Sequence, residues 1–267
     1  MKIKLHGVEE TMLIPLLIKA EETCKPSPRL YDKKSVEMIS KIDYDFSKYQ
    51  HRKFSAGGVI ARSVMLDRSV STFIGEHPDA VCICIGCGLD ARFYRMDNGR
   101  IDWYDLDLPN VMNIRTQLLP EQERVHCISC SALDRIWTQE VAAEGRDVII
   151  ILEGILMYFT ERQVKELFDL LADCFPGATV LAELFPASLI KSGRRHETVS
   201  KTGAVFRFGA KNGRDIERLC PRAKFISQQS LNAEMKTYGF SFWLFGTLPG
   251  LKNYNDFIAV YHLLAKA

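Results

Sequence analysis

The spacing of apolar residues changes near residue 80. Before that point it is helical, because Val36, Ile39 and Ile42 recur every third position after Asp32, a residue type that often begins helices. Residues 81–85 then form a short apolar run that ends in glycine, which is typical of a strand buried on both faces of a parallel sheet. The pattern therefore predicts a helical N-terminal segment followed by the first strand of a sheet.

Four more apolar runs follow, with helical segments between them. The helix before the last run is the clearest, because Thr160 and Gln163 form a capping box and Pro176-Gly177 ends the helical pattern. Pro109 at a first helical turn indicates that the second strand, which ends near Asp107, leads directly into a helix. Such alternation predicts βαβ units, with strands over residues 101–105, 125–129, 148–152 and 178–184.

The last part of the chain has a different pattern. Apolar segments 240–244 and 257–264 are joined by a loop too short for a crossover helix, so we expect them to pair as antiparallel strands. The expected fold class is α/β, a doubly wound, mostly parallel sheet with an antiparallel C-terminal hairpin and extra N-terminal helices. We expect one domain over residues 1–267, with a helical cap at 1–78, a core at 79–185, a charge- and glycine-rich insertion or lid at 186–230 and final strands at 231–267.

The composition is that of an ordinary globular protein. Its 47% hydrophobic and 25% charged residues exclude a disordered or fibrous chain. With 35 Lys and Arg against 33 Asp and Glu there is no basic excess, so we expect neither nucleic acid nor a membrane surface as a partner. No apolar run approaches the ~20 residues of a membrane-spanning helix and no signal-peptide pattern is present, so we expect a cytoplasmic protein.

Eight cysteines raise the question of a metal. Two C-x-x-C pairs, 84–87 and 127–130, have the arrangement of a four-thiolate zinc site. However, Cys82 and Cys84 lie in the run that is typical of a buried strand, where cysteine acts as a small apolar residue. The gap between the pairs also exceeds the ~15–20 residues usual for such zinc modules. We therefore expect reduced thiols and no metal.

Glycines and acids follow the ends of the predicted strands, where open α/β sheets bind their ligands. Gly86 and Gly88 let the backbone turn sharply and approach a ligand, and an acid about 20 residues further on can bind both hydroxyls of a ribose. The acids at that distance are Asp105 and Asp107. This spacing does not distinguish NAD from S-adenosylmethionine. Asp90 favours a cationic sulfonium ligand, because a pyrophosphate would need a helix N-terminus without a carboxylate.

Three motifs are more specific: GCGLDAR at 86–92, YDLDLP at 104–109 and LEGILMY at 152–158. Together with the earlier Ala61-Arg62 they resemble the leucine carboxyl methyltransferase family, and in particular its bacterial branch of tetracenomycin-type polyketide O-methyltransferases. The likeness extends from about Gly7 to Leu184 and is only general after that. It implies a class I, S-adenosylmethionine-dependent methyltransferase that acts on a carboxyl or hydroxyl group of a small molecule. A protein C-terminus is a less favoured acceptor.

The resemblance also implies how the amino-acid end of the methyl donor is held. Arg62 would bind the methionine carboxylate, a role that suits the forked geometry of a guanidinium. Lys19 lies where the family has a basic residue that reaches the same carboxylate. Glu153 would face the amino or sulfonium end of the donor, where a negative charge is favourable.

For the nucleoside end, the resemblance implies that Gly86 and Gly88 line the methionine and ribose. Asp107 would hold the ribose diol, with Asp105 in a supporting place. After the third strand, Ser131-Ala132 replaces the Asp-Leu pair usual in the family. The adenine amino group would therefore meet a hydroxyl or a carbonyl, which weakens binding by roughly 1 kcal/mol.

On the acceptor side the candidates are Tyr158 and His196, and Phe206, Phe208 and Trp243 are candidates for an aromatic wall. A carboxylic acid is already ionised at neutral pH and needs no base, whereas a phenol with a pKa near ~10 benefits from one. The family contains both kinds of acceptor, so this choice stays open. An NAD-dependent oxidoreductase and a non-catalytic cofactor-binding protein are the alternative interpretations.

Overall fold

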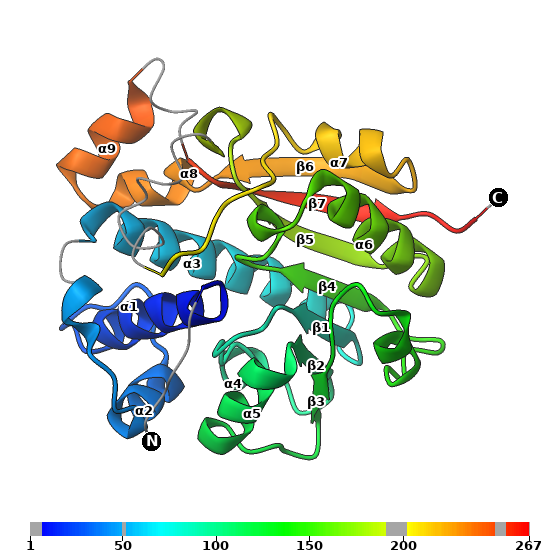
Figure 1. The fold of residues 1–267 in the computed structure, drawn as a ribbon, viewed down its shortest axis with the longest axis horizontal. Coiled ribbons are helices and arrows are strands. Elements are labelled where there is room, and N and C mark those ends of the chain that lie inside the picture. The colour runs from blue at the N-terminus through cyan, green and yellow to red at the C-terminus, as the bar shows by residue number, and fades with distance from the viewer. Residues whose placement is uncertain (1–6, 50–51, 191–201, 249–254, 267) are drawn as a thin grey trace.

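The structure, a computed structural model, describes residues 7–49, 52–190, 202–248 and 255–266. Its strands are β1 (Val81–Ile85), β2 (Asp102–Asp107), β3 (Val125–Ser129), β4 (Val148–Leu152), β5 (Thr179–Leu184), β6 (Ala223–Ser230) and β7 (Phe257–Leu263). Within the described residues they form one sheet in the order β3-β2-β1-β4-β5-β7-β6 (Figure 1). Pairs from β3 to β5 are parallel, and β7 is antiparallel to both β5 and β6.

Helices precede, link and follow these strands. The α-helices are α1 (Leu13–Thr23), α2 (Lys33–Lys41), α3 (Lys53–Glu76), α4 (Phe93–Met96), α5 (Pro109–Leu118), α6 (Glu161–Cys174), α7 (Arg214–Leu219), α8 (Asn232–Met235) and α9 (Phe240–Thr247). Short 3-10 helices are η1 (Glu9–Met12), η2 (Phe46–Tyr49), η3 (Arg135–Gln139), η4 (Leu156–Tyr158) and η7 (Lys236–Tyr238). Figure 1 shows α1 and α2, in blue, on the same side of the molecule as the start of α3.

Alternate residues of the buried strands point to opposite faces of the sheet. Val81, Ile83 and Ile85 belong to a core cluster with residues of α6 and α7. Cys82 and Cys84 belong to a second cluster with residues of α3, α8 and α9. Helices therefore cover both faces, and the predicted doubly wound α/β fold with a mostly parallel sheet is confirmed.

The cysteines of the first C-x-x-C pair are part of this core. Cys84 and Cys87 are buried in the cluster beneath α3. Burial raises the pKa of both thiols well above the ordinary value, so each acts as a small apolar group. In the described part of the chain, no three His, Cys, Asp or Glu side chains are grouped so that they could hold a metal ion.

Several predicted helix boundaries are confirmed. Asp32 caps α2, because its side chain accepts a hydrogen bond from the Ser35 backbone N–H at 3.0 Å. Thr160 and Gln163 cap α6 reciprocally: the threonine hydroxyl accepts the Gln163 backbone N–H at 3.3 Å, and the glutamine side chain accepts the Thr160 backbone N–H at 2.9 Å. Pro109 is the first residue of α5, so β2 does lead directly into a helix.

The predicted strand over residues 240–244 is wrong, because this segment lies in helix α9. A short apolar run cannot be assigned to strand or helix by periodicity alone. In the structure Phe242 packs against Phe54 and Tyr238, with ring centroids 5.5 and 6.1 Å away. Strand β7 pairs antiparallel with β5 and, on its other side, with β6. Strand β6 is an edge strand that is mostly exposed and therefore lacks the apolar pattern of a buried strand.

Part of the insertion predicted at 186–230 is regular secondary structure. Residues 214–230 contain α7 and β6, which belong to the sheet and its covering layer. Residues 191–201 lie outside the described residues, so the lid remains a prediction. At the N-terminal end α3 packs on the sheet, while α1 packs against α2 and α3. None of the helices in the described ranges has the length and apolar character needed to cross a lipid bilayer.

Candidate functional site

A cavity of about 660 Å³ lies where the carboxyl ends of the parallel strands meet α1 and α3. Asp105 lies behind its wall, and His196 lies outside the described residues. The predicted site residues that do line the cavity are Lys19, Arg62, Gly86, Gly88, Asp107, Ser131, Ala132, Glu153 and Tyr158. Residues as far apart in the chain as Lys19 and Tyr158 therefore line the same cavity.

The turn after β1 depends on its glycines. Gly86 and Gly88 have φ angles of +70° and +49°, a region that residues with a side chain rarely adopt. A Cβ at Gly86 would also lie 2.6 Å from Cδ1 of Ile155, which is too close. The backbone N–H of Gly86 donates to the Leu106 carbonyl at 2.8 Å, and this bond fixes the turn against β2.

Asp107 is held rigidly at the end of β2. One carboxylate oxygen accepts the Gly88 backbone N–H and the other accepts the Leu108 backbone N–H, each at 2.7 Å. Each oxygen has a second lone pair, so the carboxylate retains the capacity to bind a ligand hydroxyl. Burial raises the pKa of Asp107, although the two backbone N–H groups act against this.

Asp105 supports the same turn from behind. Its carboxylate is buried, accepts the Trp103 indole N–H at 3.0 Å and forms an ion pair with Arg115. Arg115 in turn donates to the carbonyl oxygens of Gly88 and Asp90, at 3.1 and 2.7 Å. The pair therefore joins β2 and α5 to the glycine turn.

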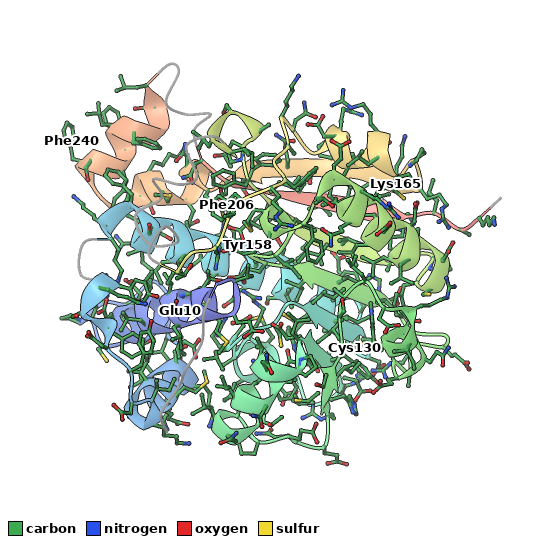
Figure 2. All side chains as sticks on the ribbon, viewed as in Figure 1. Glu10, Cys130, Tyr158, Lys165, Phe206 and Phe240 are labelled. Atoms are coloured by element: carbon green, nitrogen blue, oxygen red, sulfur yellow. The ribbon has the colours of Figure 1, made fainter. Side chains whose placement is uncertain are left out.

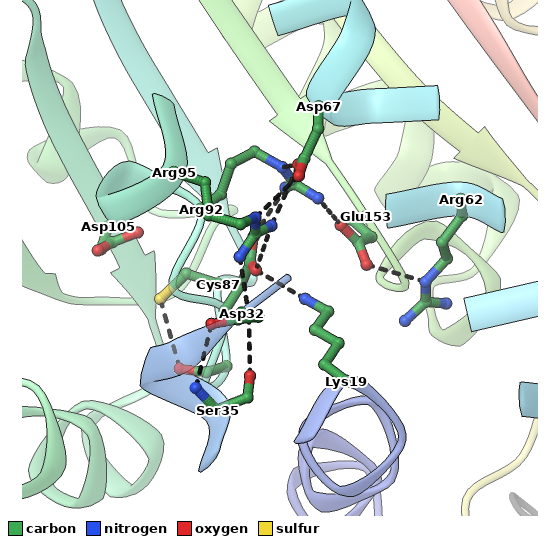
Figure 3. Close-up of polar contacts among 12 residues, drawn as sticks. Lys19, Asp32, Ser35, Arg62, Asp67, Cys87, Arg92, Arg95, Asp105 and Glu153 are labelled. Atoms are coloured by element: carbon green, nitrogen blue, oxygen red, sulfur yellow. Dashed lines mark hydrogen bonds and ion pairs between the residues drawn. The ribbon is translucent and has the colours of Figure 1, made fainter. Parts of the chain in front are cut away.

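A buried chain of ion pairs links the cavity-lining residues Lys19, Glu153 and Arg62 (Figure 3). Lys19 Nζ lies 2.7 Å from an Asp90 oxygen, and the other Asp90 oxygen lies 2.7 Å from Arg92 Nη1. Arg92 Nη2 lies 2.6 Å from Glu153, whose second oxygen lies 2.9 Å from Arg62 Nε. Helices α1 and α3 are thereby linked through charges to the ends of β1 and β4.

The chain of ion pairs continues from Arg92 to Asp67, Arg95 and Asp32. Asp67 pairs with Arg92 at 2.6 Å and with Arg95 at 2.8 Å, and Arg95 also pairs with Asp32 at 2.8 Å. Burial acts to raise the pKa of Glu153, but the cations around it hold that pKa at about 2. We call the whole set the buried network: Lys19, Asp32, Arg62, Asp67, Asp90, Arg92, Arg95, Glu153 and Glu183.

Two carboxyl groups of the wall were not found from the sequence. Glu183, at the end of β5, accepts the Gly154 backbone N–H at 2.7 Å and Arg62 Nη1 at 3.2 Å. Asp256, directly before β7, lies against Glu183. Burial and then the Glu183 charge raise the pKa of Asp256 well above its ordinary value, while Arg62 opposes the shift. The rule that ligands lie at the carboxyl ends of strands would have identified Glu183.

Aromatic side chains form the wall on the β5 side. Tyr158 and Phe206, which are labelled next to each other in Figure 2, pack together with ring centroids 5.5 Å apart. The ring centroid of Phe206 lies 4.6 Å from that of Phe185. Burial raises the pKa of Tyr158 to about 12, so its hydroxyl stays protonated near neutral pH. Phe208 is part of the main core, and Trp243 is half exposed and lies away from the cavity wall.

Comparison with protein families finds a match over more than half of the chain. The model of the leucine carboxyl methyltransferase family matches residues 20–172. The matched span contains α1 from Ala20 onwards and continues through most of α6.

Two relatives are similar over most of their length. The tetracenomycin polyketide synthesis O-methyltransferase TcmP of Streptomyces glaucescens is 31% identical over 230 residues, which cover 86% of this chain and 85% of TcmP. The S-adenosyl-L-methionine-dependent methyltransferase dpfgK of Gibberella zeae is 26% identical over 269 residues, covering 92% and 90%.

A solved structure supports the fold. The crystal structure of a putative methyltransferase from Thermobifida fusca superposes with a TM-score of 0.62 and covers 94% of each chain. Its sequence is only 12% identical, so the similarity concerns the fold alone.

Proposed function

This chain belongs to the leucine carboxyl methyltransferase family, and on that premise we propose that it transfers a methyl group from S-adenosylmethionine to an oxygen atom of a small molecule. The relatives TcmP and dpfgK are named as methyltransferases, and the name of TcmP specifies O-methylation in polyketide synthesis. The structural observation that carries the proposal is the cavity wall, where a glycine turn, an acid at the end of β2 and the buried network lie together.

The charge of the buried network fits this methyl donor. The network contains four cations, Lys19, Arg62, Arg92 and Arg95, and five carboxylates, and therefore has one excess negative charge. S-adenosylmethionine has a carboxylate, an ammonium and a sulfonium group, and therefore one net positive charge. A donor of this charge would neutralise the buried excess.

Individual residues of the wall would hold individual parts of the donor. Lys19 and Arg62 would bind its carboxylate, and Glu153 would face its cationic end. Asp107 would accept hydrogen bonds from the ribose hydroxyls through the lone pairs that Gly88 and Leu108 do not use. Ser131 and Ala132 line the cavity where the adenine would lie. We call these residues together with Gly86 and Gly88 the donor half of the cavity.

The glycine turn and helix α4 are poorly suited to bind a pyrophosphate, which an NAD-dependent oxidoreductase would have to bind. The helix after the glycine turn, α4, has only four residues. Asp90 lies between that turn and the helix, with its carboxylate in the buried network. A nicotinamide dinucleotide would therefore meet a negative charge where it needs a free helix N-terminus.

The bound donor supplies an electrophilic methyl group, and the residues of this chain have to align an acceptor and exclude water. The aromatic and apolar side chains of Met157, Phe185 and Phe206 form one cluster beside Tyr158. With Tyr158, Glu183 and Asp256 they form what we call the acceptor half of the cavity. Such a wall suits a flat, partly apolar substrate, which supports a polyketide-like or other secondary metabolite as the acceptor.

Binding of S-adenosylhomocysteine, the product form of the donor, tests the proposal. Saturating S-adenosylhomocysteine should raise the melting temperature by mass action, and NAD should not. Asp107→Asn should weaken binding of S-adenosylhomocysteine in calorimetry by about ten- to a hundredfold, because it removes a charged hydrogen-bond acceptor. The matched control is Asp79→Asn, at an exposed carboxylate that pairs with Arg100 on the surface. A melting curve that shifts with NAD and not with S-adenosylhomocysteine would refute the proposal.

A further inference from the structure

Two carboxyl groups of the acceptor half lie at the junction of two strands. Glu183 is the penultimate residue of β5, and Asp256 directly precedes β7, which pairs antiparallel with β5. In this pairing Glu183 is opposite Ile258 and Leu184 is opposite Phe257. The amino end of β7 therefore meets the carboxyl end of β5, and both carboxyl groups face the cavity.

The two groups differ in how they are held. Glu183 is fully buried and fixed by the Gly154 backbone N–H at 2.7 Å and by Arg62 at 3.2 Å. Asp256 is partly exposed to the cavity, and its side chain is close enough to Glu183 to share a hydrogen bond. The charge of Glu183 repels a second negative charge beside it and therefore disfavours the ionised form of Asp256.

The ionisable groups around the pair come from each element that packs against it. They are Arg62 from α3, Glu153 after β4 and Tyr158 from η4. Arg62 is shared between Glu153 and Glu183, so its charge is only partly available to Asp256. Burial and the Glu183 charge therefore raise the pKa of Asp256, which makes its ionised form a stronger base than an ordinary carboxylate.

On the basis of the proposed function, we propose that the Glu183–Asp256 pair takes the proton of a hydroxyl acceptor, and that the substrate is therefore a phenol or a similar hydroxyl and not a carboxylic acid. A carboxylic acid is ionised at neutral pH and would bring a further negative charge to this pair. A phenol is neutral, with a pKa near ~10, and needs a base. Tyr158, with a pKa of about 12, is not that base.

The reaction step balances with the pair as the proton acceptor. The acceptor oxygen forms a bond to the methyl carbon while the carbon–sulfur bond breaks, and the electron pair of that bond remains on sulfur. The proton of the acceptor passes to the ionised Asp256 carboxylate, and the electron pair of the O–H bond stays on the acceptor oxygen. Glu183, fixed by Arg62 and Gly154, orients Asp256 during this transfer.

Matched aromatic substrates test the substrate class in the wild-type protein. We expect methylation of 2-naphthol and none of 2-naphthoic acid, which has the same ring system. The rate with 2-naphthol should rise with pH until Asp256 is ionised, because only the ionised form accepts a proton. Methylation of 2-naphthoic acid with no methylation of 2-naphthol would overturn the inference.

Asp256→Asn tests the residue. We expect kcat with 2-naphthol to fall by about a hundredfold or more and its rise with pH to disappear. With 4-nitrophenol at alkaline pH, where this phenol is already ionised, most of the deficit should vanish. A purely structural role predicts the same deficit for both phenols, and that result would overturn the inference.

Two readouts do not depend on activity. The infrared carbonyl band of a protonated carboxyl group should titrate at a raised pH in the wild type and be absent from Asp256→Asn. The affinity of Asp256→Asn for S-adenosylhomocysteine should stay within about twofold of the wild type. If Asp256→Asn does not fold, Asp256→Glu keeps a carboxyl group and should retain the pH dependence. Failure of the wild type to bind S-adenosylhomocysteine would instead refute the proposed function.

Discussion

Arg92 provides the most direct test of the buried network. Its guanidinium has 0% exposure and pairs with Asp67 at 2.6 Å, Asp90 at 2.7 Å and Glu153 at 2.6 Å. Arg92→Met keeps an unbranched apolar side chain but leaves three buried carboxylates without their shared cation. Removal of one partner from a buried ion pair costs about 3–5 kcal/mol, because the charge left behind has neither solvent nor counter-charge.

The structure places the expected cost at the lower end of that range. Each of the three carboxylates keeps a second cation: Asp67 keeps Arg95 at 2.8 Å, Asp90 keeps Lys19 at 2.7 Å and Glu153 keeps Arg62 at 2.9 Å. We therefore expect Arg92→Met to lower the free energy of unfolding by about 3 kcal/mol. For a chain of this size that corresponds to a fall in melting temperature of roughly 6–12 °C.

The assay is urea unfolding, followed by circular dichroism, with Arg100→Met as the matched control. Arg100 pairs with Asp79 on the surface, where the two side chains are 58% and 61% exposed. Exposed pairs contribute little, so the control should lie within about 0.5 kcal/mol of the wild type. If the free energy of unfolding of Arg92→Met lies within about 1 kcal/mol of the wild-type value, the ion pairs of Arg92 do not stabilise the buried carboxylates as we argue.

Two further predictions follow from the same structure. The pKa of Glu153 is about 2, below its value in an unfolded chain, so its contribution to stability is complete above about pH 5 and is lost as the pH falls toward 2. Glu153→Gln should flatten the pH dependence of the unfolding free energy in that window, and an unchanged slope would contradict the assignment. Gly86→Ala should weaken S-adenosylhomocysteine binding in calorimetry. It should also lower the free energy of unfolding by more than about 1 kcal/mol, because an alanine there would combine a φ of +70° with a clash against Ile155. Gly99→Ala, at φ +82° in open space, should cost only the backbone strain and leave binding unchanged.

The sequence was informative where the signal is local. The capping box at Thr160 and Gln163 and the apolar runs of the central strands depend on residues close together in the chain, and these predictions are confirmed. The exposed edge strand β6 and helix α9 were missed for a physical reason. An edge strand does not need apolar side chains, and a short aromatic run satisfies both a strand and a helix.

The residues of the candidate site also differ in whether local sequence signals identify them. Gly86, Asp107 and Glu153 could be found because each directly follows or ends a strand that is visible in the sequence. Glu183 satisfies the same rule at the end of β5, so it was within reach of sequence reasoning. Asp256 was not, because it reaches the site from the amino end of an antiparallel strand, and the pairing partner of that strand must be known first.

Arg62 shows what only the three-dimensional arrangement can supply. The resemblance implies that it binds a carboxylate of the donor, whereas the structure places its guanidinium between Glu153 and Glu183, side chains that are 91 and 121 residues away in the chain. Arg62 therefore touches both halves of the cavity, and its substitution would disturb donor binding and proton transfer together. Asp107 and Asp256 each line only one half. Variants of those two aspartates, and not of Arg62, can therefore separate recognition of the donor from chemistry at the acceptor.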